Sequence, residues 1–175
     1  MPDKVLVVEG LKKSFGSNLV LDEAQIEVFR VEVHALVGEN GAGKSTMMNI
    51  VSGVHRRDAG KIYLAGKEVN FSSPRDACIA GVGFVHQEMA LCQHMSVAEN
   101  VFMWNIPKKK NGLVDFKALY ANTNALLRMF GTGFDARTCV GSLTVAQQQV
   151  VEIVRALSMN AKLVIFDEPT SSLTE

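Results

Sequence analysis

The stretch Gly38 to Thr46, which reads GENGAGKST, decides the fold of this chain. It matches the pattern G-x-x-x-x-G-K-[ST], in which glycines let backbone N–H groups wrap around a polyanion. Lys44 supplies a flexible cation for β- and γ-phosphates, and the Ser45 hydroxyl supplies a hard oxygen ligand for Mg²⁺. A helix that opens at Lys44 adds its positive N-terminal end. The alternative is a glycine-rich turn followed by a solvated lysine.

The loop residues that we expect to bind a phosphorylated ligand are Gly38, Glu39, Asn40, Gly41, Ala42, Gly43, Lys44, Ser45 and Thr46. Of these, Gly38, Gly41 and Gly43 are expected to permit the special dihedral angles and the close approach that the loop needs.

The sequence around this loop favours the strand, loop and helix order that the motif requires. Val33 to Val37 (VHALV) predicts a buried strand, and Thr46 to Val51 predicts a helix that Gly53 ends. Further on, Lys162 to Phe166 (KLVIF) predicts another buried strand, which runs into two acids. Strands that alternate with helices imply an α/β fold with a parallel sheet covered by helices.

Local patterns predict the remaining elements. The predicted strands are Val5–Val8, Gln25–Val33, Lys61–Ala65, Glu68–Phe71 and Val82–His86, with turns at Gly16–Asn18 and Gly66–Lys67. The predicted helix starts are Ser73-Pro74, the capping boxes Ser96–Glu99 and Thr144–Gln147, and Asp115. The lysine-rich segment Pro107 to Gly112 is interpreted as an exposed loop between helices.

Composition limits the class of protein. The 175 residues suffice for one domain with a substantial core, and the 18 basic and 18 acidic residues balance to a net charge of zero. This balance offers no electrostatic case for nucleic acid. Three isolated cysteines favour free thiols in a reducing compartment such as the cytosol. No apolar run approaches the roughly 18 residues of a membrane span, so membrane association is expected to go through a partner.

Four further residues are candidates for chemistry. A phosphate loop needs a partner carboxylate, and we expect Asp167 to hold the Mg²⁺ environment and Glu168 to polarise the attacking water. The alternative is two acids that merely start a turn. Gln87 directly follows a predicted strand, at the end where ligands sit in open α/β sheets. Phe15 precedes a turn, where an aromatic ring either stacks on a purine or joins the core.

Five stretches together resemble the nucleotide-binding domain of ATP-binding cassette (ABC) transporters. They are the phosphate loop, Gln87, LTVAQQQ from Leu143, LVIFDE from Leu163, and the following EPTSSLTE. The resemblance implies a P-loop NTPase core sheet, an N-terminal antiparallel β portion and a helical insertion subdomain. It implies one ATP-binding domain over 1–175, comprising a core with the β portion over 1–91, a helical part over 92–157, and a return to the core over 158–175.

The same resemblance implies ATP and Mg²⁺ as the ligands and gives roles to single residues. Phe15 matches the aromatic of the adenine-stacking loop. Gln87 matches the glutamine that senses Mg²⁺ and the γ-phosphate and couples to the membrane subunit. The implied catalytic residues are Glu168, Gln87 and Lys44, and the implied metal residues are Ser45, Gln87 and Asp167.

Leu143 to Gln147 matches the family's signature motif, which reaches across a dimer to the other subunit's ATP. A helix start with free N–H groups is a physically suitable anion site. The residues expected to contact that ATP are Thr144, Ala146 and Gln147, with Val145 and Ala146 where the family usually has two glycines.

Within the family, the stretches SGVHRRDAGKI, SPRDA, FVHQEMAL and SVAEN look most like ATPase subunits that import simple sugars of the ribose, galactose or xylose type. Those subunits usually carry two cassettes, so this chain is expected to be the front of the first. It stops before the place of the family's switch histidine, so an incomplete cassette is also expected.

The implied partners are a second cassette, transmembrane permease subunits and, indirectly, a sugar-binding protein, with no direct nucleic acid. The implied location is peripheral, on the cytoplasmic face of the cell membrane. Two alternatives stay open at this point. One is an ABC ATPase that acts on ribosomes or DNA, and the other is an ATP-binding fragment without catalysis.

Overall fold

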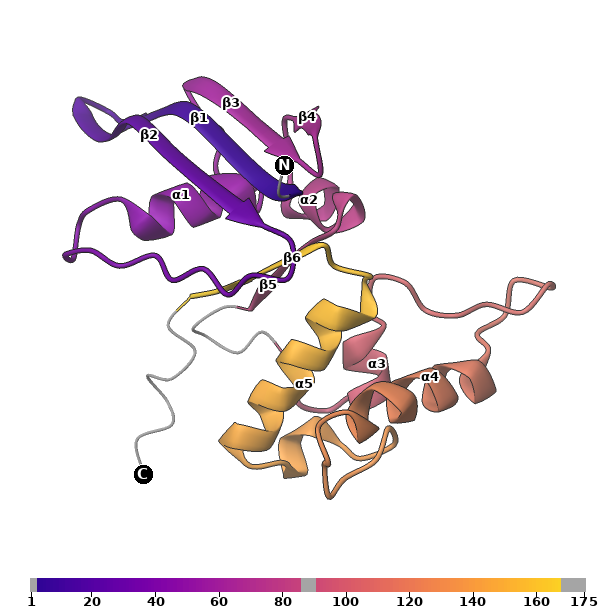
Figure 1. Cartoon of the computed structure of the whole chain (residues 1–175). Helices are drawn as coiled ribbons and strands as arrows, with labels where there is room; N and C mark the ends of the chain where they lie inside the picture. Colours follow the sequence, from indigo (N-terminus) through magenta and orange to yellow (C-terminus); the bar gives the residue numbers. More distant parts are fainter. Residues whose placement is uncertain (1–2, 86–90, 168–175) are drawn as a thin grey trace. The chain divides into compact units, whose positions relative to one another are not determined.

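The computed structural model describes residues 3–85 and 91–167 (Figure 1). The chain divides into two compact units, Met1–Gly83 and Phe84–Glu175. The domain limits inferred from the sequence stay a prediction.

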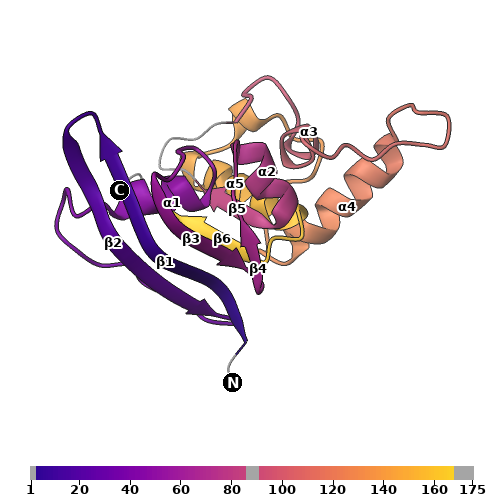
Figure 2. The same ribbon diagram turned by 90° about the horizontal axis from the view of Figure 1, so that it is seen from above.

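The first unit is built on a four-stranded sheet with the order β2-β1-β3-β4 (Figures 1 and 2). The strands are β1 Lys4–Phe15, β2 Asn18–Phe29, β3 Ala59–Leu64 and β4 Lys67–Val69. All three neighbouring pairs are antiparallel, which confirms the predicted antiparallel β portion. Gly16 and Ser17 form the turn between β1 and β2, as predicted, while the turn between β3 and β4 lies one residue earlier than predicted, at Ala65 and Gly66.

Two helices complete the first unit. Helix α1 (Lys44–Val51) lies along one face of the sheet (Figure 1) and buries Met47, Ile50 and Val51. Helix α2 (Pro74–Ala80) starts as predicted, with the Ser73 hydroxyl accepting a hydrogen bond from the Asp76 N–H. The apolar side chains that the sheet contributes to the core include Leu6, Val8, Leu11, Leu21, Ile62 and Leu64.

The strand predicted at Val33–Val37 does not form, and β2 ends at Phe29 rather than at Val33. Val31 takes a left-handed backbone (φ 57°), which breaks the extended conformation, and the Glu32 carboxylate accepts a hydrogen bond from the Phe29 N–H. Val33 and Val37 are 100% and 88% exposed. A β-rich run becomes a strand only where a neighbour pairs with its N–H and C=O groups, and none of the described residues does so here.

The second unit is mainly helical. Helices α3 (Val97–Val101), α4 (Phe116–Arg128) and α5 (Val145–Ser158), with a short 3₁₀ turn at Val140–Ser142, surround one apolar core. The fully buried members of this core include Val97, Ala98, Val101, Leu119, Val140, Val151 and Val154. Both predicted capping boxes and the Asp115 cap are present. Among the described residues, no helix is both long and apolar enough to cross a membrane.

Strands β5 (Val82–Val85) and β6 (Leu163–Phe166) pair with each other in a two-stranded sheet. Both were predicted from short apolar runs, and both predictions are confirmed within the described residues. The Asp167 N–H donates to the Val85 carbonyl over 3.2 Å. This bond places the first acid after β6 beside the end of β5.

The capping box of α3 generates a prediction about acid stability. Hydrogen bonds from the Ser96 hydroxyl and backbone N–H hold the pKa of the Glu99 carboxyl below its usual 4.5. A lowered folded-state pKa stabilises the fold above the unfolded-state value and loses this effect as pH falls through the folded-state value. We therefore expect the difference in unfolding free energy between the wild type and Glu99→Gln to shrink below about pH 4.5.

Denaturant unfolding measured between about pH 6 and pH 3 checks this expectation. Glu9→Gln, the same chemical change on an exposed residue of β1, is the control. A difference between wild type and Glu99→Gln that stays constant over this range would contradict the assigned role of Glu99.

Candidate functional site

Helix α1 differs from the other helices in how it begins. Of the five α-helices in the described part of the chain, α2 to α5 start with a side chain that accepts a hydrogen bond from the first turn, and α1 does not. Its N-cap is Gly43, with φ 86°. The N–H groups of Lys44, Ser45 and Thr46 have no hydrogen-bond partner among the described residues. Together with the helix dipole, these groups are suited to bind an anion.

The Lys44 side chain folds back over the loop that precedes α1. Its Nζ donates to the Gly38 carbonyl (2.7 Å) and to the Glu39 carbonyl (2.9 Å). The Ala42 N–H also donates to the Glu39 carbonyl, over 3.2 Å, and closes the loop on itself. The ammonium is thus held on the preceding loop by two exposed carbonyl contacts that phosphate oxygens can replace.

Gly43 takes the left-handed dihedral angle expected of it and also lies close to β2, while its close approach to a phosphate stays a prediction. A Cβ on Gly43 would lie 2.6 Å from Leu21 Cδ2 and 3.0 Å from the Val20 carbonyl oxygen of β2. Gly41 takes a similar dihedral (φ 88°) in open space. Gly38 lies outside the left-handed region, so the expectation that its dihedral requires glycine is wrong in this structure.

The loop residues also fit a magnesium ion. Ser45 is exposed on the first turn of α1, where its hydroxyl is a hard oxygen ligand. Mg²⁺ takes one or two protein ligands and fills its other positions with water and substrate phosphate oxygens. The Ser45 hydroxyl could therefore be one of the few protein ligands that a Mg²⁺ ion needs here.

Phe15, the predicted adenine-stacking residue, is the last residue of β1 and is 44% exposed. Its ring is not isolated, because His55 makes an edge contact with it and the Lys13 ammonium lies 5.3 Å from its centre. No motif in the sequence indicates these neighbours. His55 comes from the loop after α1, and only the pairing of β1 with β3 brings that loop to Phe15.

The predicted signature residues form the start of α5. The Thr144 hydroxyl accepts from the Gln147 N–H (3.3 Å), and the side-chain amide oxygen Oε1 of Gln147 accepts from the Thr144 N–H (3.0 Å). Ala146 is exposed on the first turn. Sequence analysis missed Gln148, which is buried and donates to the Leu143 carbonyl over 3.0 Å. Its spacing from the buried Val151 was an available signal, because a polar residue on the apolar face of a helix needs a partner.

The acidic half of the predicted site is only partly described. Asp167 is partly buried and is fixed by its backbone bond to Val85. Gln87 and Glu168 lie outside the described residues. The structure therefore gathers Lys44, Gly38 and Glu39 in the first unit and Thr144 with Gln147 in the second.

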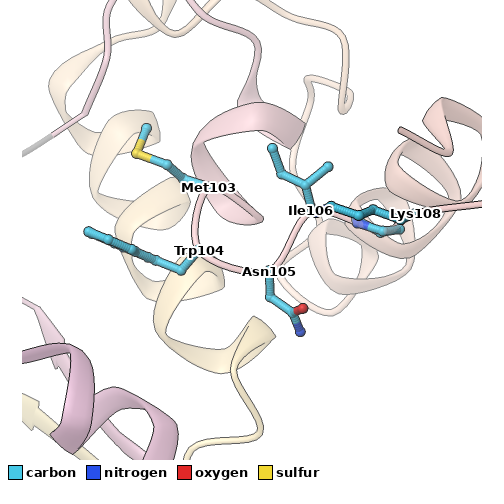
Figure 3. Close-up of a pocket in the computed structure, with 6 residues that line it drawn as sticks. Met103, Trp104, Asn105, Ile106 and Lys108 are labelled. Atoms are coloured by element: carbon cyan, nitrogen blue, oxygen red, sulfur yellow. The ribbon is translucent and has the colours of Figure 1, made fainter. Parts of the chain in front are cut away.

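A hollow of about 520 Å³ in the second unit contains none of the predicted site residues. It is lined by Met103, Trp104, Asn105, Ile106, Pro107 and Lys108. Figure 3 shows these side chains fanning out from one continuous segment after α3 rather than converging. Small-molecule sites have convergent polar groups, so this hollow does not compete with the loop before α1.

The family model described as "ABC transporter" matches residues 21–171. A ribose import ATP-binding protein of Streptomyces avermitilis is 45% identical over 99% of this chain. A putative ribose/galactose/methyl galactoside import ATP-binding protein of Agrobacterium fabrum is 44% identical over 98% of it. The chain spans about a third of the length of these relatives, 34% and 33% respectively.

Solved structures agree with this match. The ADP conformation of an ATP-binding cassette of an ABC transporter superposes with a TM-score of 0.83 and 26% identity, over 98% of this chain and 71% of that one. A nucleotide-free ATP-binding cassette gives a TM-score of 0.82 and 26% identity, over 97% and 70%. The expected α/β fold of a P-loop NTPase, with its antiparallel β portion and helical part, is confirmed.

The close approach at Gly43 generates a prediction about stability. Gly43→Ala and Gly41→Ala both place an alanine at a left-handed dihedral, which costs about 1–2 kcal/mol. Only Gly43→Ala also forces a methyl group against Leu21 and the Val20 carbonyl. We expect it to lower the unfolding free energy by about 1–3 kcal/mol more than Gly41→Ala, as for other overpacked sites. Urea unfolding of both variants measures these free energies. Equal losses of unfolding free energy in the two variants would show that Gly43 does not pack tightly against β2.

Proposed function

This chain belongs to the ABC transporter family, and from that premise we propose that it binds Mg-ATP at the loop before α1 and hydrolyses it to drive solute uptake. The observation that carries the proposal is the start of α1. A helix whose first N–H groups face solvent without a cap, beside a lysine held only by exposed carbonyls, is suited to a polyphosphate.

Each loop residue has a chemical task in this proposal. The free N–H groups of Lys44, Ser45 and Thr46 donate to phosphate oxygens, and Lys44 exchanges its two carbonyl partners for the β- and γ-phosphates. Ser45 would supply a hydroxyl ligand to Mg²⁺, and the family resemblance gives Asp167 the role of a further Mg²⁺ residue; the ion would neutralise charge that develops on the phosphates. Phe15 stacks on the adenine, since its ring is exposed at the end of β1.

The family resemblance supplies the remaining roles. Glu168 polarises the water that attacks the γ-phosphate, and Gln87 senses Mg²⁺ and the γ-phosphate and passes the change on. Thr144, Ala146 and Gln147 contact the ATP that is bound to a second cassette. Their support is the exposed first turn of α5, where the dipole of the helix favours an anion although the Gln147 N–H is taken by the Thr144 cap.

The solute that we propose is a simple sugar, because the curated relatives are named as ribose or ribose/galactose/methyl galactoside import proteins. The corresponding partners are a second cassette, permease subunits in the membrane and, through them, a sugar-binding protein. The chain then works at the cytoplasmic face of the membrane, held there by the permease.

The first test concerns Lys44. Lys44→Ala removes two charge-assisted bonds to phosphate, each worth about 1.5–3 kcal/mol, so we expect Mg-ATP affinity to fall by roughly 100-fold or more. Isothermal titration calorimetry measures the dissociation constant. Lys61→Ala, which removes an exposed lysine of β3, is the matched control and should bind as the wild type does. Unchanged affinity in Lys44→Ala would remove the loop from the nucleotide site.

The second test concerns hydrolysis. Glu168→Gln should still bind Mg-ATP, while phosphate release falls by about 10²–10⁴-fold, the usual contribution of a general base. Glu68→Gln, on the exposed side of β4, is the control.

The wild-type rate is measured at several concentrations of the chain. A rate per chain that rises with concentration supports two cassettes completing each other's sites. ATP binding without any phosphate release above the Glu168→Gln blank would instead favour an ATP-binding chain that does not catalyse.

A further inference from the structure

The Phe15 ring sits in a cluster that the motifs do not account for. The Phe15 and His55 rings have their centres 5.3 Å apart and their planes at 75°, an edge-on arrangement within the favourable range for aromatic pairs. The Lys13 ammonium lies 5.3 Å from the centre of the same ring, within reach of a cation–π contact. A half-exposed ring at the end of a strand is therefore held from more than one direction.

The loop that carries His55, residues 54–58, is fixed to the end of α1. The N–H groups of Val54 and His55 both donate to the Asn49 carbonyl, over 2.8 and 3.1 Å. Gly53, which precedes this loop, packs so tightly that a Cβ there would lie 2.4 Å from the Ser73 carbonyl oxygen. The backbone of His55 is thus held by the end of the same helix whose start follows the loop of the phosphate-binding motif.

Asp58, the last residue of this loop, is hydrogen-bonded to the strand that carries Phe15. The Asp58 carboxylate accepts from the Lys13 ammonium (2.8 Å) and from the Ser14 N–H (2.7 Å), and the Asp58 N–H donates to the Lys12 carbonyl (3.0 Å). The bond from Lys13, and then that from Ser14, lower the pKa of Asp58, so it stays ionised and bound. Asp58 therefore fixes Lys13 beside the Phe15 ring.

The ring and the phosphate loop also share one hairpin. Phe15 and Asn18 pair across the β1–β2 turn, and β2 then runs to Val20 and Leu21, which contact Gly43. A nucleotide that reaches from the start of α1 to Phe15 would therefore lie along a connected structure within the first unit.

We propose that His55 is a positioning residue that holds the Phe15 ring in the orientation needed to stack on the nucleobase. This rests on the proposed function, since it takes Phe15 as the base-binding ring. Stacking on an exposed side chain that still rotates costs conformational entropy, and a ring already held by His55 avoids that cost. His55 then affects only the part of the affinity that comes from the base.

The test compares a ligand with a base and one without. We expect His55→Ala to weaken binding of Mg-ATP about threefold to tenfold, the range that an aromatic contact contributes, and to leave binding of Mg-tripolyphosphate unchanged. His55→Phe, which keeps a ring at this position, should restore the affinity for Mg-ATP. His94→Ala, at an exposed histidine outside the first unit, is the control. Calorimetry on the full chain gives the dissociation constants.

A double-mutant cycle tests whether His55 affects the affinity for Mg-ATP through Phe15. In the Phe15→Ala background, His55→Ala should cause no further loss of Mg-ATP affinity. The proposal is overturned if His55→Ala weakens both ligands equally, if it still weakens Mg-ATP without Phe15, or if it has no effect. The proposed function survives any of these results as long as binding of both ligands depends on Lys44. If the wild-type chain binds neither Mg-ATP nor Mg-tripolyphosphate, both the proposal about His55 and the proposed function are overturned.

Discussion

The contact of Gly43 with β2 is the constraint on which the first unit depends. Helix α1 begins at a glycine that takes a left-handed dihedral and lies directly against Leu21 and the Val20 carbonyl. A larger residue would push the start of the helix away from the hairpin. Because the helix start is pinned in this way, the free N–H groups of its first turn have a fixed position relative to the β1–β2 hairpin and to the Phe15 ring at its end.

Using glycine as the N-cap has a second physical effect. In each of the four other α-helices in the described part of the chain, one first-turn N–H group donates to a cap side chain, which is Ser73, Ser96, Asp115 or Thr144. Those helices gain stability, typically about 1 kcal/mol for each cap. Helix α1 has no such cap and lacks this stabilisation, but the N–H groups of its first turn stay available to a ligand. The same chain thus contains both capped and uncapped helix N-termini. The uncapped N-terminus, that of α1, lies in the family's phosphate-binding motif.

Loop 54–58 shows how a site can be extended by residues that no motif names. It joins the end of α1 to the start of β3 and, on the way, contacts Phe15 through His55 and Lys13 through Asp58. The pairing of β1 with β3 makes these contacts possible, because Lys12 and Ala59 are partners in that pair. In this chain, loop 54–58 therefore links Phe15 to the end of α1.

The sequence by itself determined the features that depend on neighbouring residues. The start of α1 at Lys44, both capping boxes, the Asp115 cap and the turn at Gly16 are local, because each needs only a few consecutive residues to form its hydrogen bonds. The spacing of the motifs likewise identified the family, since it reflects a shared chain path.

Tertiary structure alone decided the features that need distant partners. Val33–Val37 has the composition of a strand, yet without a described neighbour to pair with its N–H and C=O groups it remains irregular and exposed. Gln148 and His55 gained their contacts from elements elsewhere in the chain. Periodicity and propensity report on the residue and its neighbours, whereas pairing and ring contacts depend on which segments the fold brings together.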